Sequence, residues 1–416
     1  MGTGWLTCIP AVLLPHSLCR STTANAPANR QMPIASVVRR NCKKTKNKIH
    51  RTTMKKLIIL LILPIIVFGC EDEKVVIKEV DKKYNWTAHE DFQYDQVIQM
   101  NSFSTPDRLF TLGMASFSSL VSDSLNHPAL PFGGSVCHYS NWFDQPSNKK
   151  LPISTNFFIS YSESAGFIGF IPTMNPVDGN AIVNITLSKL DPTFTSFQLI
   201  HYYRGEAMAI NNNNQALIPY KSTNNDFPQK LLLVNIRVKD EGIIRLDTIS
   251  TKILNIPDKD EYNVISLQSL NDNFYITMNS KTYRVNPAGE IQTVTDNRLY
   301  SIVESNNVLY GIGHEFIFSS TDSGLTWSKG YSIPFEYSML RYTKVNNKII
   351  AYRNSQLFEI TLTQDSIKAR ELDNDGLIGK TITSVSGFGS KVYVTSFSGL
   401  YSKATNSFFT DKKTEK

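Results

Sequence analysis

The sequence predicts an all-β protein made of a repeated four-stranded unit, and therefore a β-propeller. From about residue 96 onward, short runs rich in β-branched and aromatic residues alternate with clusters of turn residues, and no segment keeps helical periodicity beyond two turns. Tight turns centred near residues 272, 306, 346 and 389 lie 34, 40 and 43 residues apart, which is the length of one blade. A blade length of about 40 residues predicts seven blades, with six to eight remaining open.

The repeat is carried by a strand-turn-strand unit with constant internal spacing. An interval of nine residues separates a serine from a tyrosine in three copies, and a fourth copy is centred on 345–350. These three copies are Ser266 to Tyr275, Ser301 to Tyr310 and Ser384 to Tyr393. Weaker copies lie near residues 232, 195–210, 158 and 110, where insertions are longer. A separate amino-terminal β domain is therefore the alternative for the first half of this region.

Four runs with strand composition are distributed along this region. Each is four to six residues long and rich in β-branched, aromatic or leucine residues. They are 109–112, 156–161, 231–236 and 391–394.

The best-preserved copy of the unit contains an eight-residue motif with the pattern S-x-D-x-G-x-T-W. Its defining residues are Ser320, Asp322, Gly324, Thr326 and Trp327. The apolar run 316–318 before it has strand composition. The aspartate can accept hydrogen bonds from backbone N–H groups of a turn, and the glycine can adopt φ > 0. The tryptophan can begin the return strand and bury a large apolar surface. The motif therefore predicts a hairpin that stabilises the fold.

This motif resembles the Asp-box of the bacterial neuraminidase repeat. The resemblance implies membership of the Asp-box β-propellers, which include sialidases, sortilin-type receptors and photosystem assembly factors. It implies a fold and leaves the chemistry open. Gly289 falls at the position of Gly324 when the copies are aligned, so the same turn is expected one blade earlier.

The amino-terminal part has the organisation of a lipoprotein signal peptide. Met54 and two lysines precede an unbroken apolar run, 57–68, which Gly69 and Cys70 close. The run is too short for a comfortable membrane span. The segment 67–70 resembles a bacterial lipobox, with Phe68 bulkier than usual, and the resemblance implies a diacylated Cys70 as the first mature residue. The alternative is a plain anchor helix with an incidental cysteine.

Four regions follow from this organisation. Residues 1–53 are expected to be a misassigned upstream extension, or else a basic disordered leader, because a signal peptide does not start 53 residues into a chain. Residues 54–69 form the signal peptide, 70–95 an acidic tether and 96–416 the propeller. Within the tether, Trp86 and Phe92 are candidates for docking on the propeller.

Charge and cysteine content agree with an exported protein. The chain has 43 basic and 36 acidic residues, but eleven of the basic residues and none of the acidic ones precede Cys70. Residues 70–416 therefore carry a net charge of −4, which argues against a nucleic-acid partner. Cys137 is the one other cysteine there, so no intrachain disulfide is available if Cys70 is acylated. We expect Cys137 to be a small buried hydrophobe.

The acidic cluster 71–73 directly after Cys70 resembles the surface-export signal of lipoproteins in the Bacteroidota. The resemblance implies an outer-membrane protein anchored through its lipid, with surface display as an open possibility. The alternative is a solvated tether, since residues 71–83 are rich in charge.

Sialidase activity is the enzymatic hypothesis that the resemblance raises. That chemistry needs three arginines around a carboxylate, a tyrosine–glutamate pair and an aspartate. The nearest match to the family's Arg-Ile-Pro motif is 170–172, where Phe170 occupies the arginine position. The expected function is therefore non-catalytic binding or scaffolding with a protein or glycan ligand. The alternatives are a divergent glycosidase, a sugar-binding accessory protein, or an assembly factor with an exposed apolar rim.

No metal or cofactor site is expected. The histidines lack ligand spacing, and His314 is expected at a strand end. The run 373–376, Asp-Asn-Asp-Gly, resembles part of a calcium loop without its closing glutamate, so it is interpreted as a turn between blades.

Overall fold

The computed structural model describes residues 84–89, 99–131, 137–138, 152–173, 183–197 and 208–412. Short gaps within these ranges fall at 107, 114–115, 122–129, 163–165, 241–243, 261–262 and 364. The predicted signal peptide, Cys70, the acidic cluster and Phe92 lie outside the described residues. Among the described residues, no helix has the length and hydropathy needed to cross a bilayer.

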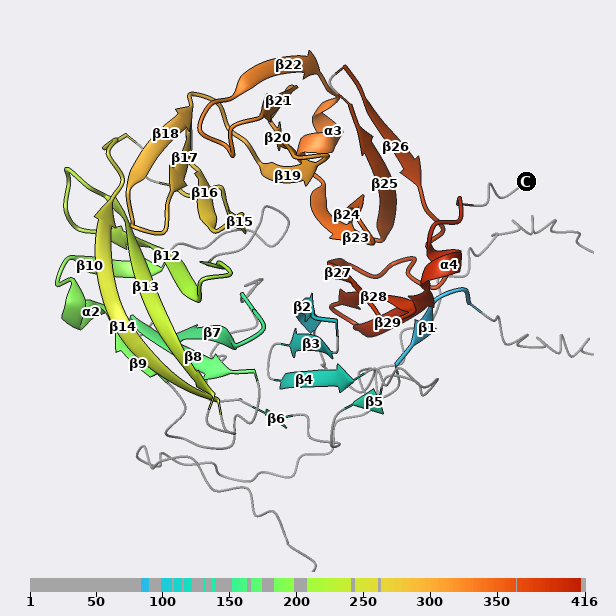
Figure 1. Cartoon of the computed structure of the whole chain (residues 1–416), viewed down its shortest axis with the longest axis horizontal. Coiled ribbons are helices and arrows are strands. Elements are labelled where there is room, and N and C mark those ends of the chain that lie inside the picture. Colours follow the sequence, from blue (N-terminus) through green and yellow to red (C-terminus); the bar gives the residue numbers. More distant parts are fainter. Residues whose placement is uncertain are drawn as a thin grey trace, which may run out of the picture. The chain divides into compact units, whose positions relative to one another are not determined.

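The described strands form seven antiparallel sheets, six of four or five strands and one of three. We number them as blades 1 to 7 in chain order (Figure 1). The first three blades carry the longer insertions that the sequence indicated. Blade 1 contains β2 (Gln99–Ser104), β3 (Arg108–Gly113), β4 (Ser116–Val121), β5 (Leu130–Pro131) and β6 (Cys137–His138). Blade 2 contains β7 (Phe157–Ser162), β8 (Phe167–Pro172) and β9 (Val183–Thr186). Blade 3 contains β10 (Phe194–Phe197), β11 (Ala209–Ile210), β12 (Gln215–Ser222), β13 (Gln229–Asp240) and β14 (Ile244–Asn255), preceded by α2 (Leu187–Leu190).

Blades 4 to 6 are regular four-stranded meanders. Blade 4 contains β15 (Ser266–Leu270), β16 (Asn273–Thr277), β17 (Thr282–Val285) and β18 (Ile291–Thr295). Blade 5 contains β19 (Ser301–Ser305), β20 (Val308–Ile312), β21 (Phe316–Ser320) and β22 (Ser328–Ser332), followed by α3 (Phe335–Ser338). Blade 6 contains β23 (Arg341–Val345), β24 (Lys348–Arg353), β25 (Gln356–Leu362) and β26 (Ile367–Glu371).

Blade 7 closes the ring with strands from both ends of the propeller. It contains β27 (Ile382–Phe388), β28 (Lys391–Ser396) and β29 (Gly399–Ala404), followed by α4 (Thr405–Phe408). Its fourth strand is β1 (Thr87–Ala88), which pairs with β29. The propeller therefore begins before the boundary predicted at residue 96, and residues 87–88 are part of a blade. The predicted docking of Trp86 is confirmed, because its side chain is only 3% exposed.

Successive blades pack against one another around the ring. The contacting strand pairs are β14 with β8, β11 with β15, β15 with β19, β19 with β23, β23 with β27 and β27 with β2. Blades 1 and 2 share a core cluster that includes Phe110, Leu112 and Phe157. The core is thus divided into apolar clusters between neighbouring blades. The all-β propeller predicted from the repeat is confirmed (Figure 1).

The predicted repeat corresponds to the first hairpin of each regular blade. Asn306 and Asn307 join β19 to β20 with φ of 52° and 63°, and Asn346 and Asn347 do the same between β23 and β24 with 50° and 60°. Asn271 and Asp272 repeat this geometry in blade 4. Two consecutive residues with positive φ define the turn type that best matches the twist of paired strands, and asparagine tolerates that conformation.

Burial follows the position of each strand in its blade. All five residues of β16 are buried, because a middle strand has sheet neighbours on both edges and packs against adjacent blades on both faces. The outermost β22 and β26 have the polar sequences SKGYS and IKARE, with no buried residue. Charged side chains on such edges also discourage pairing with other chains.

Candidate functional site

The eight-residue motif forms the connection between the third and fourth strands of blade 5. Asp322 Oδ1 accepts hydrogen bonds from Ser320 Oγ at 2.7 Å and from the backbone N–H groups of Leu325 and Thr326 at 3.1 and 3.0 Å. Asp322 Oδ2 accepts from Thr326 Oγ1 at 2.6 Å. The Thr326 hydroxyl, the Thr326 N–H and the Ser320 hydroxyl hold the pKa of Asp322 well below its usual range. The carboxylate therefore organises the turn as an ionised acceptor.

Two further residues of the motif connect it to blade 4. Gly324 has φ of +79°, and an added Cβ would collide with the hydroxyl of Tyr275 on β16. That hydroxyl donates to Ser323 O at 3.1 Å, and the Tyr275 and Trp327 rings make an edge-to-face contact at 6.4 Å. Gly289, aligned with Gly324 on sequence, also has positive φ, at +76°. The motif is therefore a structural device that orders a turn and joins two blades.

Side chains on the first strands of successive blades link one blade to the next. Gln268 of β15 donates to Ile302 O at 2.7 Å and accepts from Ile302 N at 3.1 Å. Lys344 of β23 forms an ion pair with Glu304 of β19, with 3.6 Å between Nζ and Oε2. This pair joins blades 5 and 6.

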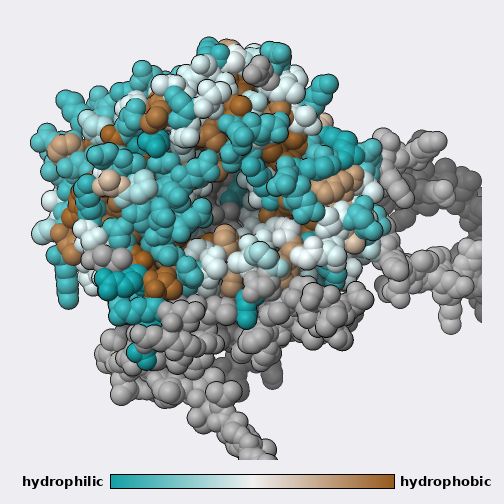
Figure 2. All heavy atoms as spheres, in the orientation of Figure 1, coloured by the Kyte–Doolittle hydropathy of each residue, from teal (hydrophilic) through white to brown (hydrophobic). Residues whose placement is uncertain are grey.

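The same pattern continues to blades 7 and 1. Arg341 of β23 donates through Nη1 to Thr383 O at 3.0 Å. The Ser102 hydroxyl of β2 lies 3.0 Å from that of Ser384 and 2.7 Å from that of Ser386, both on β27. Figure 2 shows mostly hydrophilic residues around a central hollow. These contacts use the polar groups of the first strands to hold the ring. The Tyr352 hydroxyl also donates to Thr383 O, at 3.2 Å, so Arg341 and Tyr352 share this acceptor.

The run interpreted as a turn between blades connects blades 6 and 7 and also binds the amino-terminal segment. Asp373 Oδ2 accepts hydrogen bonds from Lys403 Nζ at 2.7 Å and Asn85 Nδ2 at 2.8 Å, and Asp373 O accepts from Trp86 Nε1 at 3.1 Å. Burial raises the pKa of Asp373, but the hydrogen bonds from Lys403 and Asn85 outweigh it and lower the pKa. Lysine thus neutralises the carboxylate that a calcium loop would offer to the ion. Among the described residues, no group of three His, Cys, Asp or Glu side chains could hold a metal.

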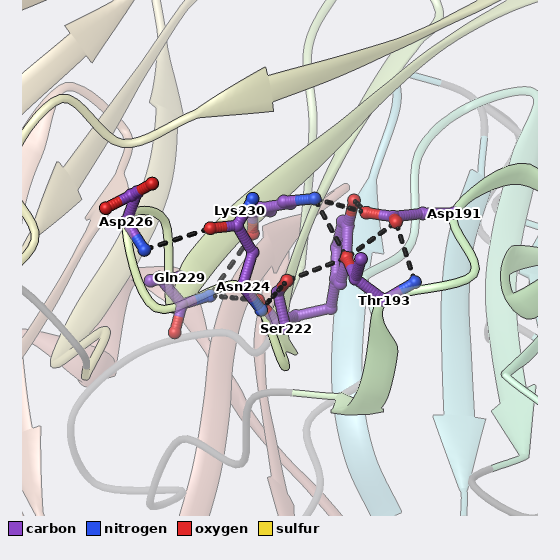
Figure 3. A network of polar contacts seen from close by, with 8 residues as sticks. Asp191, Thr193, Ser222, Asn224, Asp226, Gln229 and Lys230 are labelled. Carbon is purple, nitrogen blue, oxygen red and sulfur yellow. Dashed lines mark hydrogen bonds and ion pairs between the residues drawn. The ribbon is translucent and has the colours of Figure 1, made fainter.

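A second buried Asp–Lys pair lies in blade 3 (Figure 3). Asp191 Oδ2 accepts from Lys230 Nζ at 2.8 Å and from Tyr220 Oη at 2.7 Å, and Thr193 Oγ1 donates to Asp191 Oδ1 at 2.6 Å. Burial raises the pKa of Asp191, yet hydrogen bonds from Lys230, Thr193 and Tyr220 bring it well below its usual range. Burial and the Asp191 carboxylate raise the pKa of Tyr220. Tyr220 therefore donates to the Asp191 carboxylate from a fully buried position and ties the strand β12 to the segment that follows α2.

Two residues relevant to the sialidase hypothesis, Phe170 and Arg370, have structural contacts. Phe170, at the arginine position of the family motif, is fully buried in β8 and packs on Phe157 with ring centroids 5.8 Å apart. Arg370 forms ion pairs with Glu359 and Asp411 at the outer edge of blade 6. No arginine occupies the position that the family motif requires.

Three aromatic side chains that sequence reasoning did not bring together lie on the loops of blade 5. Tyr300 precedes β19, His314 lies between β20 and β21 as predicted for a strand end, and Phe335 begins α3. The His314 and Phe335 ring centroids are 4.5 Å apart, and those of Tyr300 and His314 are 6.3 Å apart. Phe335 is 48% exposed. We call these three residues the aromatic array. Their separation in sequence, 14 and 21 residues, carries no periodic signal.

Comparison with known proteins assigns the chain to no family. No family model matches the chain, and no curated protein matches it. Catalytically inactive virginiamycin B lyase from Staphylococcus aureus, with quinupristin, is 12% identical with a TM-score of 0.48, covering 77% of this chain and 98% of that one. The WD40 domain of Neurospora crassa Pan2 is 11% identical with a TM-score of 0.45, covering 80% and 99%. PorZ, a surface component of the type-IX secretion system of Porphyromonas gingivalis, is 10% identical with a TM-score of 0.43, covering 80% of this chain but 39% of PorZ. Each likeness concerns the fold alone.

Proposed function

We propose that this protein is an outer-membrane lipoprotein whose β-propeller is a non-catalytic binding module for an envelope protein or glycan. The observation that carries the binding role is the aromatic array, where Phe335 is 48% exposed beside His314. Leaving a phenylalanine half exposed forgoes part of the roughly 1.5–3 kcal/mol that burying such a side chain contributes. The exposed rings stand on loops fixed by a rigid scaffold, where binding residues concentrate.

Three charged side chains that are already paired with opposite charges support a non-catalytic role. Asp191 and Asp373 are each neutralised by a buried lysine, and Arg370 is paired with two carboxylates. Acid–base catalysts instead need side chains that reach a substrate and carry a pKa near the working pH. The shifts of Asp191 and Asp373 move their pKa values away from neutrality.

The lipid anchor is tested by expressing the full chain in a Gram-negative host and fractionating its membranes. We expect wild-type protein in the outer membrane, with a mature amino terminus at diacylated Cys70 in the mass spectrum. Cys70→Ala is expected to lose both the lipid and the membrane association. Cys137→Ala is the matched control, since Cys137 lies in β6, and is expected to keep both. An unmodified amino terminus at another residue in wild type would overturn the anchor.

The binding role is tested with the full chain carrying Cys70→Ala, so that membrane association does not interfere. Immobilised protein is challenged with solubilised envelope proteins and with a glycan array, beside the same protein carrying Phe335→Ala. We expect a retained ligand whose binding the second substitution weakens, and no turnover of sialoside substrates. Hydrolysis of a sialoside would establish the glycosidase alternative. Binding that is indifferent to Phe335 would place the binding surface elsewhere.

A further inference from the structure

The loops that carry the aromatic array are held in place by backbone hydrogen bonds. Tyr300 N donates to Ile312 O at 2.8 Å, Gly313 N donates to Phe316 O at 2.9 Å, and Ile333 N donates to Glu315 O at 2.8 Å. These bonds connect the segment entering β19, the β20–β21 turn and the segment leaving β22. The rings of the array are therefore presented by an ordered surface, which lowers the entropic cost of binding.

Phe335 faces outward although the rest of its helix is anchored. The Ser338 hydroxyl donates to Phe335 O at 2.7 Å, and Ser338 is buried. The hydroxyl of Tyr342 donates to Tyr337 O at 2.8 Å. Hydrogen bonds to two of its carbonyl groups thus hold the helix, and the Phe335 ring remains exposed beside His314.

An acidic residue directly follows two members of the aromatic array in the chain. Glu315 follows His314 directly, and Glu336 follows Phe335. Both are exposed, and within the part of the chain that the structure describes neither side chain is in an ion pair. Aromatic faces beside carboxylates form a surface of negative potential, because the π face of a ring is itself electronegative.

Another aromatic ring of blade 5, that of Phe316, already has a lysine ammonium group over its face. Lys329 Nζ lies 3.4 Å from the centroid of the Phe316 ring. Lys348 Nζ similarly lies 4.3 Å from the centroid of Phe409. Among the described residues, no Lys or Arg covers the ring of Phe335 in this way. The closest basic residue along the segment entering β19 is Arg298, whose Nε donates to Asn279 O.

We propose that the aromatic array, together with Glu315 and Glu336, binds a lysine or arginine side chain of a protein partner. This inference rests on the proposed function and identifies the chemistry of its ligand. The ring of Phe335 receives the cation and the two carboxylates neutralise it. A neutral sugar would also stack on an aromatic ring but would leave the two carboxylates without a charged partner. The net charge of −4 for residues 70–416 adds a long-range attraction for basic proteins.

The test is a calorimetric titration of the full chain carrying Cys70→Ala with a hexa-arginine peptide at low ionic strength. A hexa-serine peptide and a neutral oligosaccharide serve as comparison ligands. Phe335→Ala is expected to weaken hexa-arginine binding about threefold, the effect of one exposed cation–π contact. The double substitution Glu315→Gln and Glu336→Gln is expected to weaken it at least as much. Glu290→Gln with Asp226→Asn removes the same charge from exposed positions of blades 4 and 3 and is expected to have a smaller effect.

The outcomes separate this inference from the proposed function. Equal weakening by both pairs of charge-removing substitutions, with no effect of Phe335→Ala, would mean that only the net charge attracts the peptide and would overturn the inference. Binding of the neutral oligosaccharide that Phe335→Ala abolishes would assign the array to a glycan, which keeps the proposed function and rejects the basic side chain. Unchanged thermal unfolding of Phe335→Ala, expected for an exposed residue, shows that the variant is folded.

Discussion

The hydroxyl of Tyr275 in blade 4 donates a hydrogen bond to the carbonyl of Ser323 in blade 5, at 3.1 Å. This contact places the tyrosine directly above Gly324, where no side chain fits. The glycine of the motif is therefore required twice, once for its φ of +79° and once for the approach of a neighbouring blade. An isolated hairpin would account for the first requirement only.

Gly324→Ala is expected to lower the free energy of unfolding by about 2–5 kcal/mol. The left-handed conformation contributes roughly 1–2 kcal/mol, and forcing a methyl group against the Tyr275 hydroxyl contributes roughly 1–3 kcal/mol. Urea denaturation of the full chain measures the change. Gly379→Ala is the matched control, because Gly379 has nearly the same φ, +77°, with nothing within 4 Å of an added Cβ. A loss no larger than that of Gly379→Ala would contradict the role of Tyr275.

Asp322 is expected to make stability depend on pH in the acid range. Its pKa is lowered in the folded state, so the stabilisation is complete above the unfolded pKa of about 3.9 and is lost as the pH falls toward the folded pKa. At pH 7, wild type should therefore unfold at a higher temperature than Asp322→Asn, and the difference should shrink below about pH 4. Thermal unfolding of both proteins between pH 3 and 7 measures this. A difference that stays constant over this range would contradict the assignment.

The hydroxyl of Tyr220 is expected to contribute more to the free energy of unfolding than the hydroxyl of a tyrosine whose partner is uncharged. Its Oη donates to the ionised Asp191 carboxylate in a fully buried position, and hydrogen bonds to charged groups contribute about 1.5–3 kcal/mol. Tyr342 Oη donates to a backbone carbonyl, a class of bond that contributes about 0.5–1.5 kcal/mol. Denaturation of Tyr220→Phe and Tyr342→Phe compares the two. An equal loss of stability in both variants would show that the charge of Asp191 does not strengthen the hydrogen bond.

The regular blades could be predicted from the sequence because their signals are local. A pair of turn residues such as Asn306 and Asn307 marks a hairpin through its own tolerance of positive φ, and the repeat distance then gives the blade. The turn position of Gly324 could be predicted in the same way, because its role as a turn glycine depends on residues within the same eight-residue motif. Local chemistry at a constant spacing was sufficient for the architecture.

The closure of the ring and the candidate binding surface could not be predicted, because each joins distant residues. A strand of two residues such as β1 has no periodicity, and its pairing with β29 depends on register across more than 300 residues. The sequence alone predicts Lys403 to be a surface residue, and only the fold shows that it lies beside Asp373. The exposure of Phe335 is likewise set by how α3 is anchored, and an aromatic residue in sequence more often indicates core.

Lys403→Met is expected to loosen the closure of blade 7. Removing one partner of a buried ion pair leaves the other charge without compensation, which costs about 3–5 kcal/mol. The measurement is urea denaturation combined with limited proteolysis, since Asn85 and Trp86 are bound to the same Asp373 and should become susceptible to cleavage. The matched control is Lys412→Met, whose ion pair with Glu371 is solvent-exposed and contributes no more than about 1 kcal/mol. If both variants lose the same stability and residues 84–89 stay protected, the buried pair does not hold the amino-terminal strand in the ring.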